Sequence, residues 1–473
     1  MTGPTTLSIA EAAAALERRE LSALELTEAY LDRIAASEPE LNAYVAVTAD
    51  AARAAAEQAD RLLRRGGAVG ALCGIPLGIK DLYDVAGVAT TAGSPLLRQA
   101  VAGSDSTVAV RLRAAGAVLL GKHSTHEFAW GGTTNNPHLG PTRNPHDRAR
   151  VPGGSSGGSA ASVVAGSCAG AFGTDTCGSI RIPAALCGCV GLKPTFGRIS
   201  LHRVVPLAYS LDHGGPLART VRDVALLYSA VAGFDAADAR TLPVAVPDVV
   251  AELESGVSGL RVGRLRGWFE DVLDPDVRCA LDRASEALAD AGCTVSDVLP
   301  AGTDAPVDDV FTVVAADAVP WHWATFGRDA EGYSPALRAQ LAGVPGAEAA
   351  ARAREAVAVE VAALLDALRG ADLLLCASVP APAPLIGEER VNVDGHELHI
   401  EWMLTRLTSV FDAARLPALS VPFGRSRDGL PVGVQLVGRY LDEGTVLRAG
   451  RELERREGSR PSSKIRSSRD DDR

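Results

Sequence analysis

The sequence predicts an α/β protein, because segments with helical periodicity alternate with short apolar runs typical of strands. Two capping-box patterns, Ser8-Ile-Ala-Glu11 and Ser22-Ala-Leu-Glu25, each begin a segment with helical periodicity. A buried strand is expected over 74–80, followed by a helix over about 106–115 and a strand over 117–120. The composition, with 47% hydrophobic and 22% charged side chains, is that of a globular chain and excludes disordered, collagen-like and disulfide-scaffold classes.

The same alternation extends through the rest of the chain. A helix over 51–65 ends at Gly66-Gly67, and another begins after Thr220. Further strands are expected at 260–265, 294–299, 372–377, 418–421 and 432–437. The Ala-rich region over about 308–368 lacks strand signals and is interpreted as a cap or insertion beside the sheet. The chain of 473 residues allows about three domains or one large α/β unit.

Charge and cysteine usage exclude several classes of protein. The net charge of −11 disfavours a nucleic-acid-binding surface, which needs a basic face. The N-terminus lacks the basic region of a signal peptide, and no apolar run reaches the length of a membrane span. Eight cysteines form no C-x-x-C pair, so we expect reduced thiols in a core and a cytoplasmic protein. The Ser-, Arg- and Asp-rich tail over 458–473 is expected to be disordered.

The segment over 152–215 is dense in Gly, Ser and Thr but contains interleaved apolar pairs, which favours tightly packed backbone over a linker. Its first motif, Gly153–Ser159, lacks the Lys-Ser/Thr that completes a phosphate-binding P-loop. The motif also fits G-x-S-x-G around Ser156, with His213-Gly-Gly as an oxyanion motif. A nucleophile elbow needs a strand directly before it, however, and residues 144–152 are polar and turn-like.

The second motif runs from Gly173 to Pro183 and contains Ser179 among small residues. The backbone N–H groups just before this serine can converge on one point and form an oxyanion-binding nest. The alternative is a tight turn whose hydroxyl side chains bind their own backbone. The residues of this motif alone favour the tight turn.

Lysine is rare in this chain, since only four of the 47 basic residues are Lys. Lys80 lies in an apolar context before Asp81, where it is either an edge-strand lysine paired with Asp81 or Asp84, or a buried lysine. Burial lowers the pKa of an amine, and a neutral amine can serve as a base for a hydroxyl, which arginine cannot. The nine histidines show no metal-ligand spacing, and His126 is interpreted as a pocket-lining group.

Taken together, these motifs resemble the amidase signature family over roughly Ile9 to Glu454. The resemblance rests on four segments in the family's order: GIPLGIKD (74–81), GGSSGGS (153–159), GTDTCGSIRIPAALCGCVGLKP (173–194) and GLPVGVQLVG (429–438). It implies a large mixed β-sheet core surrounded by α-helices, without metal or cofactor. It also implies one amidase domain over 1–457, which comprises N-terminal helices 1–70, a signature core 71–235, a cap-like region of about 300–370 and the rest of the core, 371–457.

The resemblance also implies roles for individual residues. Ser179 resembles the nucleophile, Ser155 the bridging serine after a non-proline cis peptide bond, and Lys80 the base. The implied oxyanion donors are the backbone N–H groups of Thr176, Cys177, Gly178 and Ser179, and the implied supporting residues are Ser156, Asp175 and Arg181. Cys177 departs from the glycine of many members and would be strained if its φ were positive. A role for the Cys177 thiol as nucleophile would leave Lys80 and both serines unexplained.

The expected reaction is hydrolysis of a carboxamide C–N bond through a serine acyl-enzyme, which releases ammonia or an amine. The alternative is the A-type glutaminase subunit of a tRNA-dependent amidotransferase, but the acidic chain and the composition of 329–368 favour a stand-alone amidase. A non-catalytic relative is disfavoured because all three triad positions are filled. The expected partner is a small-molecule amide, with neither nucleic acid nor membrane, and a homodimer is compatible with the sequence. The pocket is expected near 128–133 and the cap-like region that contains Trp321 and Trp323.

Overall fold

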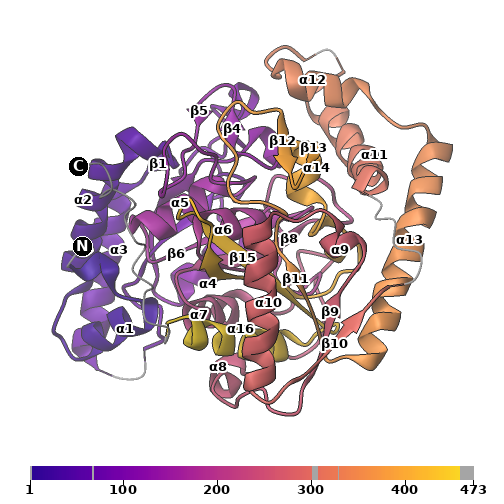
Figure 1. The fold of residues 1–473 in the computed structure, drawn as a ribbon. Coiled ribbons are helices and arrows are strands. Elements are labelled where there is room, and N and C mark those ends of the chain that lie inside the picture. Colours follow the sequence, from indigo (N-terminus) through magenta and orange to yellow (C-terminus); the bar gives the residue numbers. More distant parts are fainter. Residues whose placement is uncertain (1–2, 67–68, 301–306, 329, 459–473) are drawn as a thin grey trace, which may run out of the picture.

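A computed structural model describes residues 3–66, 69–300, 307–328 and 330–458 of the chain (Figure 1). Its centre is an 11-stranded mixed sheet, as expected. In spatial order the strands are β1 (Tyr44–Val47), β3 (Val118–His123), β2 (Pro76–Lys80), β6 (Gly170–Asp175), β8 (His213–Ala218), β7 (Val190–Lys193), β14 (Ala418–Arg425), β15 (Pro431–Gly438), β11 (Leu373–Ala377), β9 (Arg261–Leu265) and β10 (Thr294–Val298). The β3–β2–β6 and β10–β9–β11 neighbours pair in parallel, and the other pairs are antiparallel.

Helices surround this sheet. They are α1 (Ile9–Glu17), α2 (Ala23–Leu41), α3 (Ala49–Arg65), α4 (Thr107–Ala114), α5 (Gly157–Ala165), α6 (Arg181–Cys187), α7 (Val221–Val231), α8 (Val249–Glu252), α9 (Trp268–Asp271), α10 (Pro275–Asp290), α14 (Ile400–Thr405), α15 (Ser409–Ala413) and α16 (Glu443–Gly458). Leu419 and Val421 of β14 pack on α16, whereas Ser420 between them shares the other face with Gly433 and Ala185 of α6. Because side chains alternate along a strand, α16 and α6 cover opposite faces of the sheet.

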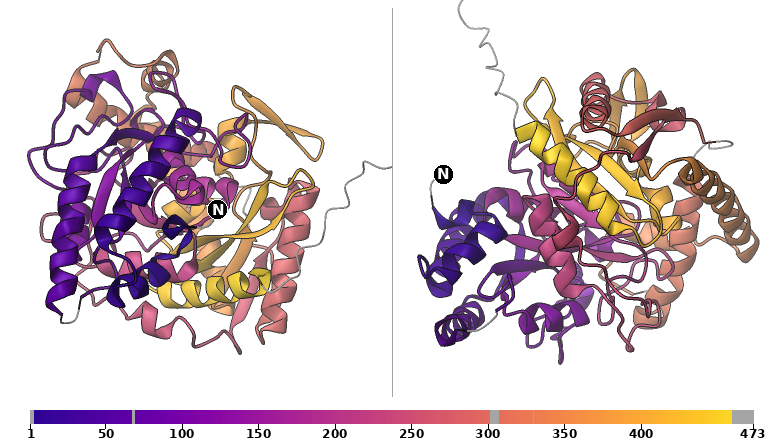
Figure 2. Two further views of the ribbon diagram at one scale, coloured as in Figure 1. Left: turned by 90° about the vertical axis from the view of Figure 1, so that its left-hand side faces the viewer. Right: turned by 90° about the horizontal axis from the view of Figure 1, so that it is seen from below.

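The Ala-rich region forms three helices, α11 (Val307–Phe326), α12 (Pro335–Ala342) and α13 (Ala347–Gly370). They lie at the opposite end of the molecule from α1–α3, beside the sheet rather than on it (Figures 1 and 2). α11 packs against α12 and α13, and both α11 and α13 contact α15. The expected cap-like region is therefore mainly helical where the structure describes it, and 301–306 and 329 lie outside the described residues.

Most predicted elements are present with small shifts at their ends. Ser8 and Ser22 both form complete capping boxes, and Thr220 accepts a hydrogen bond from the Asp223 N–H at the start of α7. Gly458 ends α16, so the first residue of the expected tail is helical. Residues 459–473 lie outside the described residues. No strand was predicted from the sequence at the positions of β6, β7 and β8.

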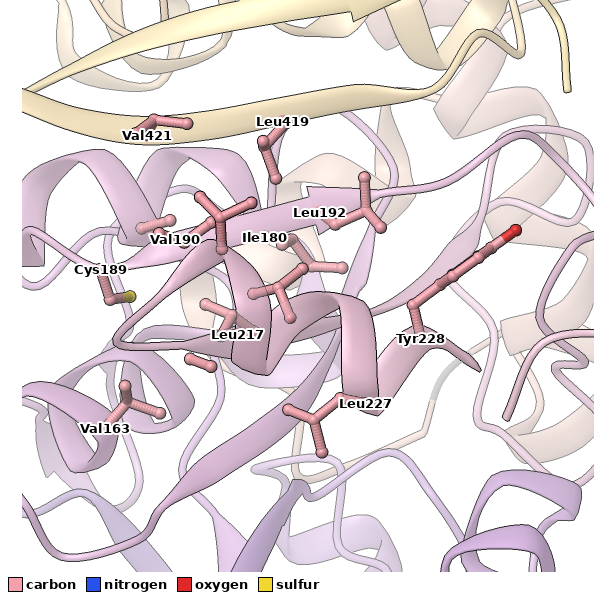
Figure 3. Packing of buried hydrophobic residues seen from close by; sticks show 14 of the residues in the cluster. Val163, Ile180, Cys189, Val190, Leu192, Leu217, Leu227, Tyr228, Leu419 and Val421 are labelled. Atoms are coloured by element: carbon pink, nitrogen blue, oxygen red, sulfur yellow. The ribbon is translucent and has the colours of Figure 1, made fainter. Parts of the chain in front are cut away.

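The central core joins elements that are distant in the sequence. Figure 3 shows Val190 and Leu192 of β7 between Leu419 of β14 and Leu217 of β8. Val163 of α5 and Leu227 of α7 belong to the same cluster. Ile180, at the start of α6, is fully buried in the same cluster. The first and last parts of the chain therefore share one hydrophobic core, which the continuous sheet spans.

The described helices include none that is both long and apolar enough to cross a membrane. All eight cysteines are free thiols, as expected, and seven of them are buried, Cys279 being the exposed one. Within the described ranges, no group of three or more His, Cys, Asp or Glu residues is placed to hold a metal ion.

A buried ion pair joins the ends of β2 and β3. Lys122 Nζ lies 2.8 Å from Asp81 Oδ1, and the two side chains are 1% and 0% exposed. Lys122 also donates to Thr90 Oγ1 at 3.1 Å. Because removing one partner of a buried pair leaves an uncompensated charge, this contact is strongly coupled to stability.

We expect Lys122→Met to lower the free energy of unfolding by about 3–5 kcal/mol, because Asp81 is then buried without its cation. The measurement is a urea denaturation series. The control is Arg352→Met, which removes an ion pair with Glu348 whose side chains are 64% and 88% exposed, and it should leave the midpoint nearly unchanged. Equal denaturation midpoints for the two variants would contradict the strong coupling of the Lys122–Asp81 ion pair to stability.

Candidate active site

Lys80 ends β2, which lies between β3 and β6 inside the sheet. The interpretation of Lys80 as an edge-strand lysine paired with Asp81 or Asp84 is therefore wrong. Its side chain is fully buried, and Nζ lies 2.7 Å from Ser155 Oγ and 2.8 Å from Thr174 Oγ1. Burial lowers the pKa of Lys80 to about 7, against the opposing pull of the Asp175 and Asp212 carboxylates. Near neutral pH a large fraction of this amine is uncharged.

The Gly/Ser motif brings Ser155 to this amine. The Gly154–Ser155 peptide bond is cis, as the resemblance implied, and Ser155 and Ser156 are both fully buried. Ser156 Oγ donates to the Thr174 carbonyl at 3.1 Å and accepts the Thr174 N–H at 3.3 Å. The Ser156 N–H donates to the Ser179 carbonyl at 3.2 Å. These bonds hold the Ser155 loop against both β6 and the Ser179 loop.

The loop after β6 carries Ser179 and is organised by one carboxylate. Asp175 accepts hydrogen bonds from the backbone N–H groups of Gly178 at 2.6 Å and Ile180 at 3.0 Å. Gly178 has φ +122°, a conformation that favours glycine, whereas the φ of Cys177 is not positive. The strain considered for Cys177 is therefore absent. Within the described chain, the N–H groups of Thr176, Cys177 and Ser179 have no protein acceptor.

Arg181 anchors the same loop to the C-terminal half of the sheet. Its guanidinium donates to Asp175 at 2.9 Å, to Asp412 at 2.5 Å and to Gln435 Oε1 at 2.7 Å. Arg181, Asp175 and Asp412 are all fully buried. Burial alone would raise the pKa of Asp175, but the Arg181 charge holds this pKa below its usual value. Asp175 is therefore ionised and remains a strong acceptor for the loop.

Three further side chains fix the position of the loop. Thr408 Oγ1 donates to the Cys177 carbonyl at 2.6 Å. Thr176 Oγ1 donates to Asp212 at 2.6 Å, and Asp212 also accepts the Leu207 N–H at 3.0 Å. Thr174, Asp212, Thr408 and Asp412 were not identified from the sequence, where no motif separates them from ordinary core or turn residues.

A cavity of about 300 Å³ opens at Ser179. The residues that line it come from the 128–133 segment, the Ser179 loop and the start of α6, Leu207, the cap-like helices and α14, and most of them are apolar. Of the expected segment, Ala129–Gly132 line the cavity. The cap-like region contributes Phe311, Val314 and Ala315 of α11 rather than Trp321 or Trp323. Trp321 instead packs edge-on against the buried Phe128.

Among the described residues, neither His126 nor Cys177 hydrogen-bonds the hydroxyl group of Ser155 or Ser179. His126 is not among the residues that line the cavity, although its backbone N–H donates to the Ser155 carbonyl at 3.4 Å. Burial, assisted by the charge of Lys80, lowers the pKa of His126 to about 4. Burial raises the pKa of the Cys177 thiol, so this thiol stays protonated and is a poor nucleophile.

The nucleophile-elbow interpretation of Ser156 is wrong, because no strand of the described chain leads into it and α5 begins directly after it. Its hydroxyl is bound to the Thr174 backbone and does not line the cavity. His213, the first residue of the supposed oxyanion motif, belongs to β8 and hydrogen-bonds the Leu211 carbonyl at 2.6 Å.

Comparisons with known proteins find similar sequences and structures over nearly the whole chain. The family model described as Amidase matches residues 25–447. The chain is 40% identical to the A-type subunit of a glutamyl-tRNA(Gln) amidotransferase from Anaeromyxobacter sp. (strain K), over 96% of this chain and 97% of the relative. A chain from a solved "vestigial protein complex", described as revealing the origins of an s-triazine catabolic enzyme, superimposes with a TM-score of 0.91 at 36% identity, covering 95% of this chain and 98% of its own. A bacterial aryl acylamidase of the amidase signature enzymes superimposes with a TM-score of 0.88 at 28% identity, covering 95% and 96%.

We expect Gly178→Ala to lower the free energy of unfolding by about 1–3 kcal/mol, because a Cβ at this φ collides with the Thr408 side chain and the Asp175 bond is disturbed. The matched control is Gly370→Ala, where a Cβ meets nothing within 4 Å and φ is negative. Thermal unfolding of the two variants checks this difference. A Gly178→Ala protein as stable as the control would show that the loop tolerates a side chain.

Proposed function

The chain belongs to the amidase signature family and is an amide C–N hydrolase, and we propose that Ser179, Ser155 and Lys80 are its nucleophile, bridging serine and base. The observation that supports this proposal most directly is the buried amine of Lys80, 2.7 Å from Ser155 Oγ. No carboxylate contacts this amine among the described residues, and its two neighbours are hydroxyl groups.

The proposed reaction transfers a proton along this chain of groups. Neutral Lys80 accepts the Ser155 proton while Ser155 accepts the Ser179 proton, and Ser179 Oγ attacks the amide carbonyl carbon. Lys80, now an ammonium, returns its proton through Ser155 to the leaving nitrogen as the C–N bond breaks. Water then attacks the acyl-enzyme, its proton passes to the same pair, and the carboxylate product leaves with Ser179 restored.

The backbone N–H groups of Thr176, Cys177 and Ser179 are the proposed donors to the tetrahedral oxyanion. The N–H of Gly178 already donates to Asp175 at 2.6 Å, so we assign Gly178 the role of shaping the turn. Each oxyanion donor typically contributes about 2.7–4 kcal/mol of transition-state stabilisation. Ser156, Asp175 and Arg181 act as positioning residues, because they hold the two serine loops together.

The proposed substrate is a small carboxamide or N-substituted amide with an apolar portion. The cavity of about 300 Å³ lies within the size range of small-molecule sites, and Ile182, Leu207, Phe311 and Val314 form apolar walls. We further propose that residues 1–457 form a single amidase domain that works in the cytoplasm, alone or as a homodimer, without nucleic acid, membrane or cofactor.

A second candidate function is supported by the relatives. The amidotransferase subunits that are 40% identical to this chain work on glutamyl-tRNA(Gln), as their names state, and a similar structure comes from a protein complex. The discriminating experiment compares the purified chain on small amides with the chain on glutamine, with and without added companion subunits. Glutaminase activity that appears only with companion subunits would favour this second function over the first.

We expect the purified chain to release ammonia or an amine from members of a small-amide panel without a partner. Ser179→Ala should lower kcat by at least about 10⁴-fold, because the nucleophile is lost. Cys177→Ala should retain most of the activity, since the backbone N–H remains. Wild-type turnover by Ser179→Ala would overturn the assignment of the nucleophile.

The rate should rise with pH through the range near 7, because burial lowers the Lys80 pKa to about 7 and only the neutral amine accepts a proton. Below that pKa, kcat/KM should fall by about tenfold for each pH unit. The Lys80→Arg variant should be inactive at every pH, since the guanidinium of the introduced arginine is always charged. A pH profile of kcat/KM checks both statements, and a flat wild-type profile would count against Lys80 as the base.

A further inference from the structure

The site has two compartments that meet at a narrow set of residues. The inner cavity at Ser179 holds about 300 Å³. An outer groove of about 680 Å³ runs between α11, α12, α14 and the hairpin of β12 (Arg390–Val393) and β13 (His396–His399), which Figure 1 shows beside one another. Phe311, Gln340 and Glu401 line both compartments. Any substrate that extends from the inner cavity into the outer groove passes these three side chains.

Glu401 is the one carboxylate among the residues that line the inner cavity. Its Oε2 accepts the Gly132 N–H at 2.6 Å, which orients the carboxyl group. Among the described residues, no Lys, Arg or His forms an ion pair with it. Burial raises the pKa of Glu401 to about 7, against the opposing effect of the Gly132 hydrogen bond. The Glu401 side chain is partly exposed in the structure, and a cation at this carboxylate would offset the cost of removing part of the water from its charge.

Other carboxylates close to the site already have strong partners. Asp175 is paired with Arg181 at 2.9 Å, and Asp212 accepts the Thr176 hydroxyl and two backbone N–H groups. Glu401 differs because, among the described residues, its carboxylate has no ion-pair partner and accepts a hydrogen bond only from the Gly132 N–H. The Gly132 bond needs only an acceptor oxygen, which a glutamine amide would supply equally well.

We propose that Glu401 is a specificity-determining residue that binds an ammonium group on the amide substrate. The substrate class is therefore an amide with an apolar chain in the inner cavity and a cationic amine at the junction with the outer groove. Phe311 and Gln340 flank the chain at this junction. This inference rests on the proposed function, because it assumes that the amide carbonyl is bound at Ser179.

The experiment measures kcat/KM for butanamide, hexanamide and octanamide, each with and without an ω-amino group. The assays are run at about pH 8.5, where Lys80 is neutral, Glu401 is ionised and an alkylammonium of pKa about 10 is still charged. The enzymes are the wild type, Glu401→Gln and Glu397→Gln. Glu397 is a matched control, because it lines only the outer groove and its carboxylate already accepts the Asn392 amide at 3.0 Å.

We expect the wild type to prefer the amino-substituted amide by about tenfold or more at one chain length at least, since charge-assisted hydrogen bonds are strong. Glu401→Gln should reduce this ratio to near one, mainly through KM, while Glu397→Gln should keep it. A purely structural role for Glu401 would alter both substrates of a pair equally and leave the ratio unchanged.

Two results would overturn the inference: a wild type without preference for the ammonium group, and a preference that survives in Glu401→Gln. Either result, obtained with an enzyme that hydrolyses the unsubstituted amides and loses this activity in Ser179→Ala, leaves the proposed function intact. Failure of the wild type on every amide would instead count against the proposed function as well.

Discussion

The removal of water from the Lys80 amine is the constraint on which the rest of this site depends. An ammonium group at this position would be buried with only hydroxyl partners, whereas a neutral amine matches Ser155 and Thr174 well. The carboxylates of Asp175 and Asp212 act in the opposite direction and would raise the pKa of Lys80. Their effect on the Lys80 pKa is limited because Arg181 pairs with Asp175 and the Thr176 hydroxyl donates a hydrogen bond to Asp212. The surroundings thus keep the amine near the pKa at which it can exchange protons.

The surrounding charges also connect distant parts of the chain. Asp175 ends β6 and holds the Ser179 loop, and Arg181 joins this carboxylate to Asp412 and to Gln435 of β15. A network of this kind is costly when incomplete, because each buried polar group then lacks its partner. The several bonds that Asp175 and Arg181 each make explain how a loop rich in small residues holds a defined conformation without bulky packing.

Local rules predicted the periphery of the fold better than its centre. Ser8, Ser22 and Thr220 are helix caps because their side chains satisfy backbone N–H groups nearby, a signal that is contained in a few consecutive residues. The strand β6 (Gly170–Asp175) gave no such signal, since glycine is normally depleted in strands. A Cβ at Gly173 would approach Ser156 Oγ to 2.6 Å, so close packing rather than strand propensity determines this residue.

In the candidate site, too, the residues that local motifs mark were predicted, and those that depend on distant neighbours were not. Lys80, Ser155 and Ser179 were identified from motifs and from the family resemblance, and the contact between Lys80 and Ser155 is present. Thr174, Asp412 and Glu401 could not be identified, because their roles depend on neighbours far away in the sequence. Gly178 was expected to offer a free N–H, but the folded loop directs that group to Asp175.

Direct titration of the Lys80 amine is the most decisive measurement. Because the chain contains only four lysines, protein labelled with ¹³C and ¹⁵N at lysine gives a small set of side-chain signals. Comparison with Lys80→Met assigns one of them to Lys80. Our account predicts that this signal titrates near pH 7, since burial lowers the Lys80 pKa to about 7. A Lys80 signal that remains that of a charged ammonium up to about pH 9, as for an ordinary lysine, would contradict it.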